Sequence, residues 1–502
     1  MYVTRAMSRP AHVLAIDQGT TSTRAILFDE SGRARRTAQI ELTQLYPRPG
    51  WVEHDPEEIW QSVLSTCREV AAAADGPIAA IGITNQRETT LLWERATGRP
   101  VHNAIVWQDR RSAALCERWR GAGLADIVAQ RTGLVIDPYF SASKIRWLLD
   151  TVPGLAERAW AGEIAFGTVD SFLLWRLTGG LRHATDVTNA ARTMLFDIGR
   201  LKWDSRLLDA FGIPPAVLPE VMDTAADYGM TTSELLAAPV PIAAIAGDQQ
   251  AALIGQACFR PGMVKSTYGT GAFALLNVGS EPVASRHRLL TTLAYRLRGE
   301  TVYALEGSIF VAGGAVNWLR DRLGAIRMAA EAEPLAARSD PQQRLYFVPG
   351  FAGLGAPYWS PRARGALIGM TAECSPAEIA RAALEAAGYQ TRDLIDAMKA
   401  DAGIPVTTLR VDGGMAASDW TMQFISDVVP ATVERPAEIE TTAWGAAYVA
   451  GFAQGLYPEP ENMVGAWRAG RRFAPQMPAI EREERYAGWR RAIAGVLAAA
   501  AP

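Results

Sequence analysis

Short apolar runs separated by polar turns recur along this chain, and the first pair lies near its start. Val13–Ile16 and Ala25–Phe28 are each long enough for a buried strand, and Gly19 stands between them among hydroxyl side chains. This pattern predicts a β-hairpin with Asp17 at the mouth of its turn. Because glycine lets backbone N–H groups come close to a ligand, such a turn can hold a phosphate group. An ordinary polar hairpin tip is the alternative.

A second stretch of the same kind runs from Met263 to Asn277. It has the same pattern of apolar strand, turn of glycines and hydroxyls, and apolar strand, and it follows the turn Pro261-Gly262. The two stretches predict an internal repeat in which one phosphate-type turn begins each half of the chain. Two such turns could hold a polyphosphate between two domains.

Strand-like and helix-like patterns alternate between these stretches. Apolar runs at Ile78–Ile83, Leu91–Trp93 and Ala104–Trp107 predict strands. Apolar residues at helical spacing follow Asp55, which we expect to cap a helix, with Glu58 completing a capping box. This alternation predicts an α/β fold.

The second half carries further helix and strand signals. Ser375 and Glu378 predict a capping box at the start of a long helix. Thr408–Val411 reads as a strand that runs into a pair of glycines, and Ser418 is a candidate N-cap for a helix over Asp419–Val428. A strand, a glycine pair and a helix start can receive a nucleotide, although the same pattern also occurs without a ligand.

The length of 502 residues is too great for one core and predicts at least two domains. We place the boundary within residues 247–262 and expect domains over 11–256 and 257–502, after a disordered leader over 1–10. The chain has 49% hydrophobic and 21% charged residues, which is typical of a globular protein. A net charge of −3 gives no electrostatic reason to expect a nucleic-acid partner.

Several classes of protein are disfavoured by what the sequence does not contain. Four cysteines without CxxC spacing and five dispersed histidines argue against a disulfide framework and a histidine-ligated metal site. No apolar stretch approaches the ~20 residues that span a bilayer, so we expect no membrane insertion and a cytoplasmic location. The sequence also lacks three nucleotide-binding or catalytic motifs. Without GxxxxGK[ST] a P-loop site is disfavoured, and without a GxGxxG after a strand a Rossmann dinucleotide site is disfavoured. Without GxSxG a hydrolase with a nucleophile elbow is disfavoured.

Nine motifs follow one another in an order that is typical of a known family. They are DQGTTSTRAILFD, TNQRET, VWQDRR, PYFSASK, GDQQAAL, STYGTGAF, GLGAPYW, VDGG and ETTAWGAAY, and they extend from about Val13 to about Tyr457. Together they resemble the FGGY family of carbohydrate kinases, and in particular its members that phosphorylate glycerol. The resemblance implies an actin-like, ribonuclease-H-like ATPase fold, with two α/β domains and a catalytic cleft between them.

The same resemblance implies ATP-dependent phosphorylation of glycerol to sn-glycerol 3-phosphate, in glycerol catabolism, by a homo-oligomer that is a dimer or a tetramer. Asp248 would be the general base, and Asp17 would hold Mg²⁺ mainly through water, with Asp248 as the second metal candidate. The polyol contacts of the family fall on Arg87, Glu88, Trp107, Tyr139, Asp248, Gln249 and Phe273. Its phosphate and nucleotide contacts fall on Thr20, Thr21, Ser22, Arg24, Gly269, Thr270, Gly271, Gly314, Asn317, Gly414 and Ser418.

The sequence departs from the family pattern at three places. Ser418 stands where asparagine is usual, and Asn317 stands where glutamine is usual. The segment Tyr228–Ile245 lacks the arginine and the glycine cluster with which enteric-type members bind fructose 1,6-bisphosphate. We therefore expect that this control is absent.

Two rival functions stay open from the sequence. One is an FGGY kinase for a different small polyol or ketose, such as erythritol or xylulose. The other is an actin-like or chaperone-like binding protein that is driven by nucleotide and uses similar phosphate turns. Taken singly, Arg87 and Glu88 could belong to a solvated loop, and Asp248 could be an ordinary helix cap.

Overall fold

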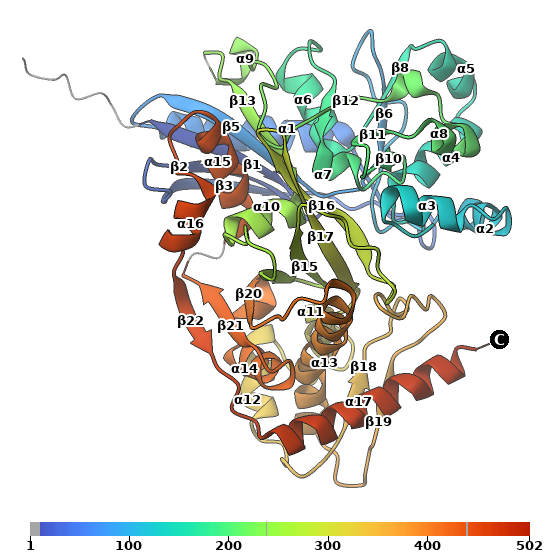
Figure 1. The fold of residues 1–502 in the computed structure, drawn as a ribbon, viewed down its shortest axis with the longest axis vertical. Helices are drawn as coiled ribbons and strands as arrows, with labels where there is room; N and C mark the ends of the chain where they lie inside the picture. The colour runs from blue at the N-terminus through green and yellow to red at the C-terminus, as the bar shows by residue number, and fades with distance from the viewer. Residues whose placement is uncertain (1–10, 237, 438–439, 502) are drawn as a thin grey trace, which may run out of the picture. The chain divides into compact units, whose positions relative to one another are not determined.

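A computed structural model describes residues 11–236, 238–437 and 440–501. The predicted leader over residues 1–10 lies outside these ranges. The chain divides into two compact units, and most of their helices and strands are labelled in Figure 1. The first unit takes the chain through Ala257 together with residues 292–303 and 441–465, and the second takes residues 258–291, 304–440 and 466–502. The predicted cleft between two domains stays a prediction.

The first unit is built on a five-stranded sheet in the order β13-β5-β1-β2-β3. Its strands are β1 (His12–Gln18), β2 (Ser22–Phe28), β3 (Ala34–Glu41), β5 (Ile78–Asn85) and β13 (Ile242–Gly247). β1 and β2 form the predicted hairpin, with Asp17 opposite Arg24. β5 runs parallel to both β1 and β13. The carboxyl ends of β1, β5 and β13 therefore lie at the same end of the sheet.

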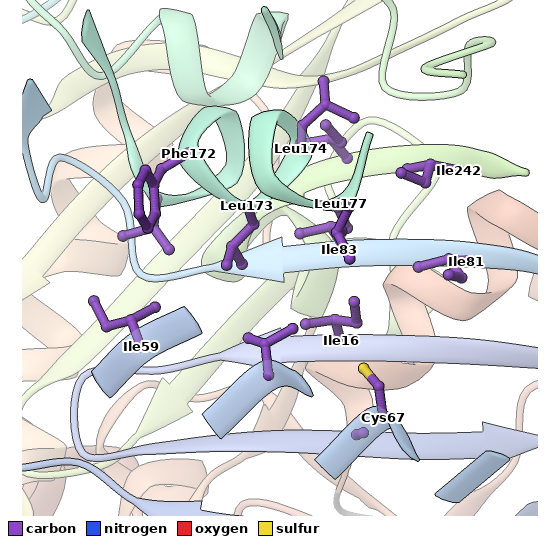
Figure 2. Close-up of a cluster of buried hydrophobic side chains, with 14 of the residues drawn as sticks. Ile16, Ile59, Cys67, Ile81, Ile83, Phe172, Leu173, Leu174, Leu177 and Ile242 are labelled. Carbon is purple, nitrogen blue, oxygen red and sulfur yellow. The ribbon is translucent and has the colours of Figure 1, made fainter. Parts of the chain in front are cut away.

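One face of this sheet is covered by the helices α1 (Pro56–Ala72) and α6 (Val169–Leu177). Because side chains alternate across a strand, every second residue of β1 and β5 points to this face. Figure 2 shows Ile16 of β1 and Ile81 and Ile83 of β5 gathered with apolar side chains of both helices. These side chains form the core of the first unit.

The opposite face is covered by α15 (Thr441–Ala453), which comes from far along the chain (Figure 1). Small residues let this helix approach closely: a Cβ atom at Gly82 would lie 2.2 Å from the carbonyl oxygen of Ala446. α15 also crosses α10 (Asp248–Gly255) at short range, since a Cβ at Gly255 would lie 1.9 Å from the carbonyl oxygen of Thr441. This packing explains why residues 441–465 belong to the first unit.

Shorter elements complete the first unit. Its remaining strands are β4 (Glu53–His54), β6 (Leu91–Glu94), β7 (Ala104–Ile105), β8 (Ile164–Gly167), β9 (Ala184–Asp186), β10 (Phe196–Asp197), β11 (Lys202–Trp203) and β12 (Glu220–Met222). Its remaining helices are α2 (Ala113–Gly121), α3 (Ala125–Thr132), α4 (Ser141–Thr151), α5 (Leu155–Trp160), α7 (Val187–Ala190), α8 (Ser205–Phe211), η1 (Pro215–Val217) and α9 (Ser233–Leu236). Helix α16 (Pro460–Ala466) begins in this unit.

The second unit contains most of a seven-stranded sheet in the order β16-β17-β15-β14-β20-β21-β22, of which residues 292–303, in β16 and β17, are assigned to the first unit. Its strands are β14 (Val264–Tyr268), β15 (Ala272–Gly279), β16 (Leu290–Leu297), β17 (Glu300–Ile309), β20 (Thr408–Asp412), β21 (Thr432–Pro436) and β22 (Ala469–Phe473), with β18 (Tyr346–Val348) and β19 (Ala366–Ile368) pairing apart. Its helices are α11 (Gly313–Asp321), η2 (Ala329–Glu331), α12 (Ala332–Ala336), α13 (Pro376–Ala402), η3 (Gly414–Ala417), α14 (Asp419–Val428) and α17 (Ala479–Ala499).

The centre of the second sheet repeats the arrangement of the first. β14 and β15 form an antiparallel hairpin, and β14 runs parallel to β20, which runs parallel to β21. In the first unit, β1 and β2 form the hairpin, and β5 and β13 are the parallel neighbours. The predicted second hairpin is thus confirmed, and the likeness of the two halves extends to four strands.

Local helix signals were mostly sufficient to locate the helix starts. Ser375 and Glu378 form the predicted capping box, and Ser418 caps α14 by accepting from the backbone N–H of Thr421. Asp55 caps α1, but Glu58 accepts a hydrogen bond from the N–H of Thr43 instead of one from the cap residue. The predicted strand Ala104–Trp107 is shorter than expected, because β7 ends at Ile105.

Candidate active site

The carboxyl ends of three parallel strands bring the predicted catalytic residues of the first unit together. Asp17 and Thr84 are paired across β1 and β5, and Gly247 and Asn85 are paired across β13 and β5. Arg87 and Glu88 follow β5 after one intervening residue, and Asp248 follows directly after β13. Ligands of open α/β sheets bind at this end of the strands.

Asp248 is held by a buried arginine. Arg87 Nε lies 3.2 Å from Asp248 Oδ1, and the Arg87 side chain is 2% exposed while that of Asp248 is 29% exposed. The guanidinium also donates to Gln250 Oε1 at 3.3 Å and to the Tyr139 hydroxyl at 3.5 Å. Asp248 Oδ1 accepts a second bond, from the backbone N–H of Gln249. The carboxylate is thus fixed in direction and still open to solvent on one side.

Glu88 is a buried carboxylate in an uncommon backbone conformation. Its φ of 60° is left-handed, a region that non-glycine residues rarely adopt. Arg192 Nε donates to Glu88 Oε1 at 2.6 Å, and both side chains are almost completely buried. The Glu88 carbonyl accepts from the hydroxyl groups of Thr90 and Ser141 and from Lys144 Nζ. These contacts fix both the carboxylate and its strained backbone.

Two aromatic side chains stand beside these charges. The rings of Trp107 and Tyr139 meet edge to face with centroids 5.6 Å apart. Trp107 Nε1 donates to the hydroxyl of Thr20 at 2.9 Å, which links the aromatic pair to the tip of the first hairpin. The arrangement joins an apolar surface to polar groups that a small polyol could contact.

The tip of the first hairpin is tied to its surroundings mainly by polar side chains. The N–H of Gly19 donates to the carbonyl of Ser22, which closes the turn. The carbonyl of Gly19 accepts from the side-chain amides of Gln18 and Gln86. Thr20 is half-buried and Thr21 is exposed, while Arg24 is half-buried on β2. The hydroxyl of Thr20 is therefore already oriented by Trp107.

The tip of the second hairpin is tied by backbone groups instead. The N–H of Gly269 donates to the carbonyl of Gly271, and Thr270 lies exposed between them. The N–H groups of Ala312 and Gly314, at the start of α11, donate to the carbonyl of Thr270. A Cβ at Gly271 would lie 2.5 Å from the carbonyl oxygen of Ile309. Glycine is therefore needed here for close backbone packing as well as for any ligand contact.

The remaining predicted residues of the second unit are spread around this tip. Gly414 follows β20 and is exposed, and Asn317 is half-buried on α11. The Ser418 hydroxyl caps α14 and donates to Glu333 Oε2 at 3.0 Å. Phe273 is half-buried on β15, where it is paired with Thr267.

The sequence alone did not indicate the residues that neutralise or orient Arg87 and Glu88 in the first unit. Arg192 neutralises Glu88, Gln250 orients Arg87, and Lys144 donates to the carbonyls of Tyr139 and Glu88. Burial lowers the pKa of Lys144 to about 8. These three residues carry no local signal, because only the folded chain brings them to Arg87 and Glu88. The GDQQ and PYFSASK motifs contain Gln250 and Lys144 without indicating what they do.

Across residues 11–236, 238–437 and 440–501, no three His, Cys, Asp or Glu side chains are grouped to share a metal ion. None of the helices in these ranges is long and apolar enough to cross a bilayer. A metal here would therefore rely on one or two carboxylates and on groups of the substrate.

Comparison with known proteins gives consistent matches over both units. Residues 12–255 match the N-terminal domain and residues 264–454 the C-terminal domain of the FGGY family of carbohydrate kinases. A glycerol kinase of Methylobacterium nodulans is 60% identical over 98% of this chain and 99% of its own. One of Cereibacter sphaeroides is 59% identical over 97% of this chain and all of its own. The crystal structure of Plasmodium falciparum glycerol kinase with ADP is similar with a TM-score of 0.92, at 35% identity over 98% of this chain and 99% of that chain.

Proposed function

The chain belongs to the FGGY family of carbohydrate kinases, and we propose that it transfers the γ-phosphoryl group of ATP to glycerol and forms sn-glycerol 3-phosphate. The observation that carries this proposal is the pairing of Arg87 with Asp248 at the carboxyl ends of β5 and β13. It supplies a carboxylate of fixed direction with one face open to an incoming hydroxyl group.

Asp248 acts as the general base in this proposal. Its carboxylate accepts the proton of the terminal hydroxyl of glycerol as that oxygen attacks the γ-phosphorus. Arg87 keeps the carboxylate aligned, and Gln250 and Tyr139 keep Arg87 in place. Such help from a general base contributes roughly 10²–10⁴-fold to a rate. The remainder of the catalysis is positioning and electrostatic stabilisation, as in other phosphoryl transfers.

The groups around Asp248 suit a short triol. Charged and hydrogen-bonding groups for the hydroxyls of glycerol come from Arg87, Glu88, Tyr139 and Gln249. The Trp107 ring provides an apolar surface for the C–H face of glycerol. Glu88 and Arg192 neutralise one another, so the Glu88 carboxylate can accept hydroxyl hydrogens without a net buried charge. The resemblance to the family implies that Phe273 also contacts the polyol, and this contact stays a prediction.

ATP is the proposed phosphoryl donor. A relative of known structure was crystallised with ADP. In this chain the proposed phosphate and nucleotide contacts are Thr20, Thr21, Ser22 and Arg24 in the first unit, and Gly269, Thr270, Gly271, Gly314, Asn317, Gly414 and Ser418 in the second. The Ser418 hydroxyl is engaged with α14 and Glu333, so we expect its part in nucleotide binding to be indirect.

Magnesium is the proposed metal, and the donor set fits it. Mg²⁺ keeps several waters and is usually held by one or two carboxylates together with substrate phosphates. Asp17, half-buried at the end of β1, and Asp248 are the carboxylates that would hold it. When bound, the ion would offset negative charge on the phosphates.

Release of ADP from Mg-ATP tests the proposed function across a small set of acceptors. The set is no acceptor, glycerol, erythritol, xylulose and dihydroxyacetone. We expect strong and selective turnover with glycerol. Preferred turnover with a larger polyol or ketose would keep the kinase reaction and overturn the proposed substrate. Equal turnover without an acceptor would indicate a nucleotide-driven binding protein instead.

A further inference from the structure

A chain of buried hydrogen bonds leads from a carboxylate in the first unit to the residue before Asp248. The backbone N–H of Gly247 donates to the hydroxyl of Thr188 at 2.9 Å, and that hydroxyl donates to Asp186 Oδ1 at 2.9 Å. Asp186, Thr188 and Gly247 come from the end of β9, from α7 and from the end of β13. Asp186 and Thr188 are fully buried. The chain is therefore shielded from water over its whole length.

The same carboxylate also holds the neighbouring strand. Asp186 Oδ1 accepts from the backbone N–H and the side-chain amide of Asn189. Asn189 exchanges two amide hydrogen bonds with Asn85, the last residue of β5, at 3.0 and 3.1 Å. Asp186 Oδ2 accepts from the hydroxyl of Thr224. One buried carboxylate thus fixes the ends of both strands that carry Arg87 and Asp248.

The position of Gly247 matters for the Arg87–Asp248 pair. A Cβ atom at Gly247 would lie 2.7 Å from Arg87 Cδ, so the arginine side chain lies directly against this backbone. Gly247 is also the N-cap of α10, whose first residue is Asp248. A displacement of Gly247 would therefore move both members of the pair.

We propose that Asp186 and Thr188 are positioning residues that hold Asp248 in its reactive direction through the backbone N–H of Gly247. This inference rests on the proposed function, in which Asp248 is the general base. Neither residue is among the proposed polyol, nucleotide or metal contacts. Buried hydrogen bonds in series strengthen one another, and an N–H left without an acceptor inside a protein is costly, so loss of the Thr188 hydroxyl should displace Gly247.

Thr188→Val tests the inference, because it removes the hydroxyl and keeps the size of the side chain. We expect kcat for glycerol to fall by about 10- to 100-fold, since a displacement of about 1 Å can cost that much in an oriented reaction. The KM for ATP should change by less than about threefold, because the variant leaves ground-state nucleotide binding intact. Thr188→Ser keeps the hydroxyl and should restore most of kcat.

Thr132→Val is the matched control. Thr132 is also fully buried in the first unit, and its hydroxyl also accepts from a backbone N–H, that of Leu134, and donates to an acceptor, the carbonyl of Val128. We expect a similar loss of thermal stability in the two valine variants and a fall in kcat in Thr188→Val alone. Equal kcat values in the two variants would overturn the inference.

Amide hydrogen exchange of the unmodified chain gives a readout that needs no variant and no substrate. The inference predicts strong protection of the Gly247 N–H, and rapid exchange at this amide would overturn it even if the variants failed to fold. Failure of the unmodified enzyme to phosphorylate glycerol would overturn the proposed function instead, and the two failures are therefore distinguishable. In that case kcat is measured with the acceptor that does turn over.

Discussion

The two sheets present different chemistry at equivalent ends. In the first unit, the carboxyl ends of β1, β5 and β13 carry Asp17, the pair Arg87 and Glu88, and Asp248. In the second unit, the equivalent ends of β14 and β20 lead into Gly269–Gly271 and into Gly413 and Gly414. The same strand order thus leads into charged side chains in the first unit. In the second unit it leads into glycines, which follow the buried Asp412 at the end of β20.

This difference fits a division of labour. Charged side chains can take a proton and orient hydroxyls, but they must be neutralised and held by partners, such as Arg192 for Glu88. Glycine has no side chain that could react or bind, but for the same reason phosphate and sugar groups can come close to the backbone N–H groups around it. The first unit therefore suits the acceptor, the base and part of the phosphate contacts, and the second unit suits the remaining contacts of the nucleotide.

Asp248→Asn should have the largest effect on the charged end. Asparagine keeps an acceptor for Arg87 and Gln249, so the fold should remain, but it cannot take a proton. We expect kcat to fall by roughly 10²–10⁴-fold, measured as ADP release with glycerol. Asp209→Asn, an exposed acid on α8, is the control and should leave kcat unchanged. Near-normal turnover of Asp248→Asn would show that another group is the base.

The second prediction concerns two buried carboxylates of the first unit, Asp186 and Asp170. Burial raises the pKa of Asp186 to about 7, with a smaller contribution from the nearby charge of Asp170, and burial raises the pKa of Asp170 to about 6. The folded chain therefore binds protons that the unfolded chain releases above its ordinary pKa near 4. The contribution of these two carboxylates to stability should therefore fall as the pH rises from about 4 through about 7, by on the order of a few kcal/mol. Burial lowers the pKa of His54 and His183 to about 4, and these histidines act in the opposite direction over the same range.

Urea unfolding across this pH range, on the unmodified chain and on Asp186→Asn, measures the effect. We expect the unmodified chain to lose stability relative to the variant as the pH rises, because asparagine does not titrate. Asp393 in the second unit, whose pKa burial also raises to about 6, leaves a background slope in both proteins. Asp29 and Glu378, whose pKa values are about 2, act below this window. Identical slopes in the two proteins would contradict the prediction.

Two adjacent glycines after β20, Gly413 and Gly414, are expected to have different roles: the first in packing and the second in ligand binding. Gly413 has a φ of 88°, and a Cβ there would lie 2.5 Å from the carbonyl oxygen of Tyr268, whereas a Cβ at Gly414 would meet no atom within 4 Å. Gly413→Ala should therefore destabilise the fold by about 1–3 kcal/mol. Gly414→Ala should leave the melting temperature unchanged and raise the KM for ATP. Equal melting temperatures for the two variants would refute this distinction.

The smallest predicted effect lies at the first hairpin tip. Trp107→Phe keeps an aromatic surface and loses the hydrogen bond to the Thr20 hydroxyl. We expect a loss of about 0.5–1.5 kcal/mol in unfolding free energy and a modest rise in the KM for ATP. Trp160→Phe, at an exposed position on α5, is the control. A KM for ATP as low as that of the control would argue against orientation of Thr20 by Trp107.

Local features of the fold followed from the sequence because their causes are local. The two hairpins, the cap at Ser418 and the capping box at Ser375 each depend on residues within a few positions of one another. The shorter β7 and the altered role of Glu58 depend on partners elsewhere: Val106 donates to the carbonyl of Val52, and Glu58 accepts from Thr43. A local sequence pattern does not show hydrogen-bond partners that come from distant parts of the chain.

The candidate site was predictable only in part for the same reason. The motifs named Arg87, Glu88 and Asp248, but nothing near them in the sequence indicates that Arg192 neutralises Glu88 or that Asp186 reaches Gly247 through Thr188. The return of α15 to the first sheet is equally non-local, since its close approach depends on small residues in both partners.

Calorimetric binding of ADP to Asp248→Asn and Gly414→Ala tests the division between the two sheet ends most directly. Both substitutions leave the packing of the chain intact, so their effects on binding can be compared. The titrations are made without Mg²⁺, because Asp248 is also a proposed ligand of that ion. The account predicts an unchanged Kd in Asp248→Asn and a Kd weakened by about tenfold, near 1.4 kcal/mol, in Gly414→Ala. A Kd that is unchanged in Gly414→Ala and weakened in Asp248→Asn would contradict it.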